Sequence, residues 1–188
     1  MFSSNHNSNS LLLRLPGELR NKIYEYAFGG HEVKLQCGPW SDDEDLYCYT
    51  QDSTVSLWSD LLSRTTICRQ IYGETRLLPY ALNTFCIPTW GAAYADWVQK
   101  LDESQKSAIK YVSLEWLGTL GLCMLPSELN HVLQALDDCA GLSHITITVE
   151  ELPSARAKIQ AFANKRGIEV ELERVKPVDY ELDSDIED

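Results

Sequence analysis

The first part of the chain carries apolar residues at helical spacing. Leu15, Leu19, Ile23 and Ala27 recur at every fourth position, which is the pattern of one face of an α-helix. A proline directly after Leu15 marks the beginning of this helix, and a Gly-Gly pair after the last apolar position marks its end. We therefore expect an N-terminal helix with an apolar face.

Two short strand-like runs follow, at residues 31–36 and 46–51, and a Gly-Pro pair and an acidic run separate them. This pattern predicts a β-hairpin with an exposed acidic connection. A second helix is expected near residues 57–77. Its apolar stripe consists of Leu61, Leu62, Ile67, Cys68, Ile71 and Tyr72.

Strands and helices alternate in the second half of the chain. The candidate strands are residues 84–87, 110–116, 144–149 and 168–174. The intervening segments show helix boundary chemistry, such as Pro-Ser before the last two helices and glycine after them. The series β-α-β-α-β-α-β predicts an α/β (or α+β) fold with mainly parallel strands, either leucine-rich-repeat-like or an open sheet.

The length of 188 residues and the 44% hydrophobic content suit one domain. We expect that domain at residues 11–176, between a disordered Ser/Asn-rich N-terminus at 1–10 and a disordered acidic tail at 177–188. No run approaches the roughly 20 apolar residues of a membrane span. The N-terminus lacks a secretion signal, so we expect a cytoplasmic or nuclear protein.

The net charge of −12 is concentrated in two segments. Residues 42–45 hold four acids and residues 179–188 hold six, without any Lys or Arg. Removing these ten from the 28 acids leaves 18 against 16 basic residues, so the body is close to neutral. Nucleic acid is an unsuitable partner for such a surface.

The six cysteines are scattered singly through apolar segments, without a Cys-x-x-Cys pair. This distribution predicts reduced core residues, although an even number also permits a disulfide framework. No zinc-ligand spacing, EF-hand loop, phosphate-binding glycine loop or nucleophile elbow is present. We expect no metal, cofactor or small-molecule ligand and no enzymatic activity, and an enzyme is the least favoured of the function classes.

Two tryptophans are candidate partner contacts. Trp40 and Trp58 flank the predicted hairpin, where an exposed aromatic ring is a typical anchor for another protein.

Two segments resemble a large family of fungal F-box-like proteins, most of which are uncharacterised. The first reads Leu-Leu-Arg-Leu-Pro-Gly-Glu-Leu-Arg-Asn-Lys-Ile-Tyr-Glu-Tyr at residues 12–26. The second reads Ile-Cys-Arg-Gln-Ile-Tyr-Gly-Glu-Thr-Arg-Leu-Leu-Pro-Tyr at residues 67–80. We call them the first and the second motif.

This resemblance implies a substrate adaptor of a ubiquitin ligase, in which the Leu-Pro helix docks on a Skp1-type linker and the rest of the chain holds a substrate. Leu15, Pro16, Leu19 and Ile23 match that docking helix. One alternative is that this apolar face packs against the chain's own second helix. Another is a binding or regulatory protein for a different partner that does not dock a Skp1-type linker.

Overall fold

The computed structural model describes residues 10–36, 45–49, 55–87, 91–115, 126–148 and 153–173. Within these ranges the strands form a seven-stranded sheet in the order β3-β2-β1-β4-β5-β6-β7. Their bounds are β1 (Glu32–Gln36), β2 (Asp45–Tyr49), β3 (Val55–Leu57), β4 (Thr84–Ile87), β5 (Tyr111–Glu115), β6 (His144–Thr148) and β7 (Glu169–Glu173).

The pairing of the strands confirms the predicted fold class. The strands β1, β4, β5, β6 and β7 are parallel neighbours in chain order. The strands β1 and β2 form the predicted antiparallel hairpin, whose acidic connection lies outside the described residues. The pattern did not predict β3, which pairs with β2 and ends the sheet on that side. Three residues are too few to show strand periodicity.

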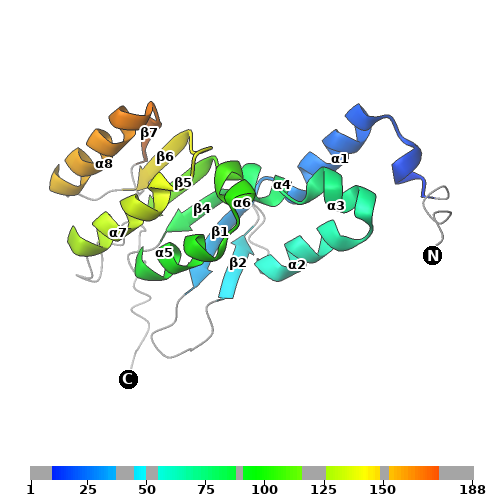
Figure 1. Cartoon of the computed structure of the whole chain (residues 1–188), viewed down its shortest axis with the longest axis horizontal. Coiled ribbons are helices and arrows are strands. Elements are labelled where there is room, and N and C mark those ends of the chain that lie inside the picture. The colour runs from blue at the N-terminus through cyan, green and yellow to red at the C-terminus, as the bar shows by residue number, and fades with distance from the viewer. Residues whose placement is uncertain are drawn as a thin grey trace, which may run out of the picture.

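The helices lie in two groups (Figure 1). Helices α5, α7 and α8 lie side by side along the parallel strands, while α1 to α4 gather at the β1 end of the sheet. Their bounds are α1 (Gly17–Phe28), α2 (Trp58–Ser63), α3 (Arg69–Thr75), α4 (Leu78–Ala81), α5 (Gly91–Lys100), α6 (Glu103–Ala108), α7 (Pro126–Asp137) and α8 (Pro153–Arg166).

Strand residues alternate between the two faces of the sheet, and the largest apolar row lies on one face. Val33, Phe85, Val112, Ile145 and Val170 are in register across the five parallel strands. The first four are at most 1% exposed, and Val170 packs at the edge of the core. These five strands are parallel, which agrees with the mainly parallel pairing that the sequence pattern predicted.

The predicted second helix at residues 57–77 is wrong as one continuous helix. It is divided into α2, the 3-10 turn η3 (Arg64–Thr66) and α3. The hydroxyls of Ser63, Thr65 and Thr66 each donate to a backbone carbonyl three residues earlier, at 2.7 Å. Such hydrogen bonds compete with helix propagation. Cys68 is extended (φ −155°, ψ 164°), so the chain changes direction before α3.

Trp58 lies in the core, which corrects the expectation of an exposed anchor at this position. Its side chain is 5% exposed, and its ring lies edge-on to the rings of Tyr80 and Phe85, with centroids 5.4 and 5.6 Å away. The cause is that Trp58 begins α2 instead of belonging to a loop beside the hairpin. Trp40 lies outside the described residues.

Two of the cysteines are buried, as predicted for core residues. Cys86 and Cys139 are 3% and 0% exposed, and burial raises the pKa of the Cys139 thiol to about 11. Cys68 is a partly exposed free cysteine. The other three side chains lie outside what the structure describes.

Candidate partner-binding surface on the first helix

Helix α1 is apolar on two opposite sides. Tyr24 and Phe28 face the body of the protein and are 2% and 3% exposed. Leu19, Ile23 and Tyr26 are 49%, 42% and 89% exposed. Their spacing of four and then three residues places them on one side of the helix. We call Leu19, Ile23 and Tyr26 the outer face of α1.

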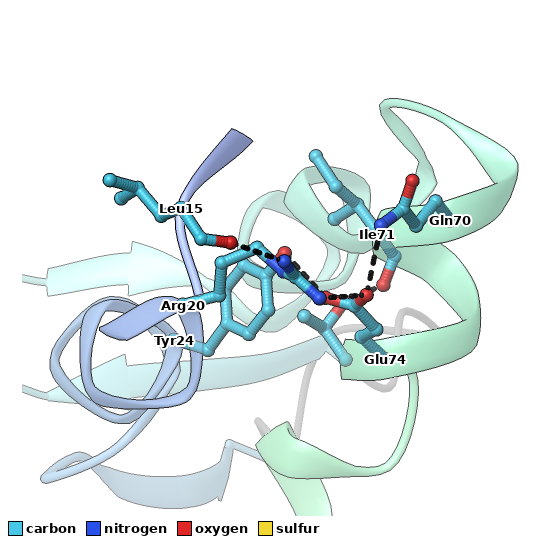
Figure 2. Close-up of polar contacts among 7 residues, drawn as sticks. Leu15, Arg20, Tyr24, Gln70, Ile71 and Glu74 are labelled. Atoms are coloured by element: carbon cyan, nitrogen blue, oxygen red, sulfur yellow. Dashed lines mark hydrogen bonds and ion pairs between the residues drawn. The ribbon is translucent and has the colours of Figure 1, made fainter. Parts of the chain in front are cut away.

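A network of polar contacts fixes α1 to α3 (Figure 2). The Arg20 Nε and Nη2 atoms donate to the Glu74 Oε2 and Oε1 atoms at 3.0 and 2.9 Å. The Tyr24 hydroxyl donates to Glu74 Oε2 at 3.0 Å, and Gln70 Nε2 donates to Glu74 Oε1 at 3.1 Å. A third donor of Arg20, Nη1, contacts the Leu15 carbonyl at 2.6 Å. The network therefore holds the helix and the residue before it in one orientation.

The contacts within the network shift the pKa values of its members. The hydrogen bond from Arg20 lowers the pKa of Glu74, and the bonds from Gln70 and Tyr24 act in the same direction. Burial is the main cause that raises the pKa of Tyr24, followed by its hydrogen bond to Glu74. Glu74 therefore remains a carboxylate and Tyr24 a neutral donor at neutral pH.

The network joins the two motifs that the sequence places far apart. Arg20 and Tyr24 belong to the first motif, and Gln70 and Glu74 to the second. The contact residues predicted from the sequence are the apolar residues of the first motif, and the polar residues of the network were not predicted. An Arg in one amphipathic segment and a Glu in another are compatible with an ion pair, but many such pairs exist in any chain.

The structure places the other predicted contact residues at the start of α1. Leu15 is half-buried and Pro16 is exposed. The Pro16 carbonyl accepts hydrogen bonds from the backbone amides of Leu19 and Arg20, both at 3.1 Å, so Pro16 caps the helix. Leu19 and Ile23 are exposed on the outer face, which differs from the alternative in which they pack against the chain's own second helix. Tyr26 belongs to the same face and was not predicted.

The second motif also exposes apolar side chains. Ile67 is 73% exposed and Tyr72 is 47% exposed. Tyr72 borders a hollow of about 190 Å³ between α3 and α6, which Arg76, Tyr80 and Asp102 also line. Burial raises the pKa of Tyr80 to about 12, and its hydroxyl accepts a hydrogen bond from Gln105 at 3.1 Å.

A second hollow, of about 290 Å³, lies between α5 and α7 beside Asp96, His131 and Asp138. Among the described residues that line the two hollows, no hydrogen bond joins two titratable side chains. Among the described residues no group of three His, Cys, Asp or Glu side chains is arranged to hold a metal ion.

One nucleophile, base and carboxylate series lies outside both hollows. Ser143 Oγ is 2.8 Å from His144 Nδ1, and His144 Nε2 is 3.0 Å from Glu169 Oε2. A Glu169 carboxylate that accepts from Nε2 leaves Nδ1 as an acceptor. The Ser143 hydroxyl has one hydrogen, which it can donate either to Nδ1 or to the Lys110 carbonyl oxygen at 3.3 Å. The sequence pattern did not indicate this arrangement, because the pairing of β6 with β7 brings Glu169 beside His144. It lies on the side of the sheet opposite the core, and its side chains belong to the surface of β6 and β7.

Comparison with known proteins identifies the family of this chain. No curated protein and no solved structure matches the chain. None of the described helices is both long and apolar enough to span a membrane. A family model described as Domain of unknown function (DUF7730) matches residues 4–141, which is more than half of the chain and contains both motifs. The chain belongs to the family described as Domain of unknown function (DUF7730).

Proposed function

We propose that the protein is a non-catalytic interaction module that docks a partner on the outer face of α1. The observation that carries the proposal is the exposure of Leu19 and Ile23 at 49% and 42%, beside Tyr26 at 89%. Contiguous exposed apolar side chains on a helix are typical of a protein-interaction site. Glu74 holds the helix through hydrogen bonds to Arg20 on another side of α1. The outer face is therefore already in place before a partner binds.

The class of partner follows from the resemblance to fungal F-box-like proteins. Such proteins dock a Skp1-type linker through a Leu-Pro helix, and the exposed Leu19 and Ile23 occupy the matching positions of the first motif. In sequence the two motifs are separated by a hairpin. In space they contact each other through Arg20 and Glu74, which supports a small helical unit at this end of the molecule.

A pull-down with a purified Skp1-type linker tests the proposal. Leu19→Asp places a charge in the outer face and is expected to abolish capture. Asn21→Asp is the matched control, because Asn21 is exposed on another side of the same helix and gains the same charge. Capture of the control at the wild-type level is expected.

The outcomes separate three functions. If the linker captures both variants as it does the wild type, the contact lies elsewhere and α1 has no docking role. Failure of the wild type to bind the linker, together with loss of cellular partners only in Leu19→Asp, would favour a binding protein for another partner. If both variants retain every cellular partner of the wild type, α1 does not bind a partner.

A further inference from the structure

The edge of the sheet at β7 is a second surface that the proposed function does not use. The strand β7 has β6 as its one neighbour among the described strands. The Glu169 amide donates to the Ser143 carbonyl at 2.9 Å, so it points toward β6. Because successive strand residues point their backbone groups to opposite sides, the amides and carbonyls of Val170 and Leu172 point away from the sheet.

The side chains of β7 have a strict alternation. Glu169, Glu171 and Glu173 are exposed on the face opposite the core. Residues two apart in a strand are about 6.6 Å apart, so the carboxylates form a regularly spaced row. On the core side Leu172 is 44% exposed beside the more buried Val170. The edge therefore offers backbone hydrogen-bonding groups, a row of negative charge on one side and an apolar contact on the other.

The contacts of these carboxylates are unequal. Glu169 pairs with His144 at 3.0 Å, and the His144 ring contacts the Tyr111 ring in a tilted arrangement at a centroid distance of 5.2 Å. Glu171 and Glu173 have no ion-pair or hydrogen-bond partner among the described side chains. Two carboxylates on this edge are therefore free to receive a cation.

We propose that the β7 edge binds an extended peptide segment of another protein that carries Lys or Arg at alternate positions. Such a segment would add a strand beside β7 and place its basic side chains opposite Glu171 and Glu173. Opposite charges at cross-strand positions stabilise pairing, whereas like charges destabilise it. A second copy of β7 is disfavoured as the occupant because it would bring Glu against Glu.

A row of charged residues also protects an edge strand from self-association. That role alone requires no accessible apolar side chain, and Leu172 is 44% exposed at the same edge. An added strand with alternating basic and apolar residues would cover Leu172 on one side and neutralise the glutamates on the other. Both features of β7 are then used at once.

Fluorescence anisotropy with two labelled peptides tests strand addition on the full chain. The first peptide is Lys-Thr-Lys-Leu-Lys-Thr-Lys, and the second has the same side chains but a methyl group on every backbone amide. Methylation removes the backbone donors and keeps every charge. At physiological salt we expect the first peptide to bind at least about fivefold more tightly. Equal affinities would mean attraction to an acidic protein alone and would overturn the proposal.

Variants of the chain locate the binding. Glu171→Gln/Glu173→Gln should weaken binding of the first peptide about fivefold. Glu18→Gln/Glu25→Gln changes the net charge equally on exposed residues of α1 and should bind as the wild type does. Equal affinities in the two double variants would overturn the proposal, and circular dichroism checks that both are folded.

Hydrogen exchange of the wild type provides a test that needs no variant. The amides of Val170 and Leu172 should become protected when the first peptide is added, and unchanged exchange at both would contradict strand addition. Leu19→Asp should bind the peptide normally. Failure at the β7 edge therefore leaves the proposed role of α1 untouched, and failure of α1 leaves this edge untouched.

Discussion

Arg20 and Glu74 lie 54 positions apart in the chain and meet through two hydrogen bonds of 3.0 and 2.9 Å. This pair converts two separate sequence motifs into one helical unit at the β1 end of the sheet. The Arg20 and Glu74 side chains are 17% and 26% exposed, so solvent weakens the pair without removing its geometric specificity.

Glu74→Gln should loosen α1 from α3, because the neutral amide cannot accept two charge-assisted hydrogen bonds from Arg20. Hydrogen exchange across residues 17–28 should become faster than in the wild type. Glu25→Gln is the control, since Glu25 is exposed on the same helix and contributes no side chain to this network. Identical exchange in both variants would show that Tyr24 and Phe28 alone hold the helix.

The same pair predicts an acid response. The pKa of Glu74 is lower in the folded protein than its ordinary value of 4.5, mainly through the hydrogen bond from Arg20. Its contribution to stability is therefore complete above pH 4.5 and is lost as the pH falls through the lowered value. Urea denaturation between pH 6 and pH 3 should show this loss in the wild type. In the Glu74→Gln variant the free energy of unfolding should fall less steeply over the same pH range.

The two sides of α1 should respond differently to truncation. Phe28→Ala removes a ring that is 3% exposed and should cost about 3–5 kcal/mol in the free energy of unfolding. Ile23→Ala removes a side chain that is 42% exposed and should change that free energy by about 0.5 kcal/mol or less. Urea denaturation measures both. A large loss for Ile23→Ala would mean that the outer face is already packed.

His31 is expected to make the fold sensitive to mild acid. Both ring nitrogens are buried and have no hydrogen-bond partner among the residues that the structure describes. Burial lowers the pKa of His31, with a further contribution from Arg64. The unfolded chain therefore takes up a proton at a higher pH than the folded one. Stability should be complete above the ordinary value of 6.5 and should fall as the pH drops below it.

His31→Phe tests this idea because it keeps an aromatic ring and removes the unpaired nitrogens. The variant should be as stable as the wild type at pH 7 or more stable, and its stability should change less between pH 7 and pH 5. Thermal unfolding at both pH values measures the difference. Equal pH dependence in the two proteins would show that His31 gains a partner in solution.

Two glycine-to-alanine substitutions should have opposite effects. A Cβ at Gly141 would overlap the backbone carbonyl oxygen of Ser107, so Gly141→Ala forces α6 and the start of β6 apart and should lower the melting temperature. A Cβ at Gly73 meets nothing within 4 Å, and Gly73 lies inside α3. Gly73→Ala should stabilise the protein by about 0.5–1 kcal/mol. Similar melting temperatures would contradict the close approach at Gly141.

The sequence predicted most of the sheet. The four strands from residue 84 onward were found within one residue of their ends. Each is a short apolar or alternating run beside a helix with clear boundary residues. The second helix was predicted as too long, because its apolar stripe continues through Thr65 and Thr66 although their side chains interrupt the helix. Hydroxyl contacts with the backbone leave little trace in a hydrophobic pattern.

The candidate surfaces needed tertiary structure. Leu15, Leu19, Ile23 and Ala27 have the spacing of a helix face, and periodicity alone reads such a face as core. The structure buries Tyr24 and Phe28 instead. Trp58 shows the reverse case, since a residue expected at a surface belongs to an aromatic cluster.

The sequence by itself determined the α/β class, the mainly parallel pairing of the later strands, and the hairpin. These depend on local periodicity and on residues that begin and end helices. Tertiary structure decided which side of α1 is exposed and that Arg20 meets Glu74. It also placed β7 last among the described strands on its side of the sheet, where Glu171 and Glu173 have no partner among the described side chains. Each of these depends on contacts between distant segments, and such contacts are set by packing of the whole chain.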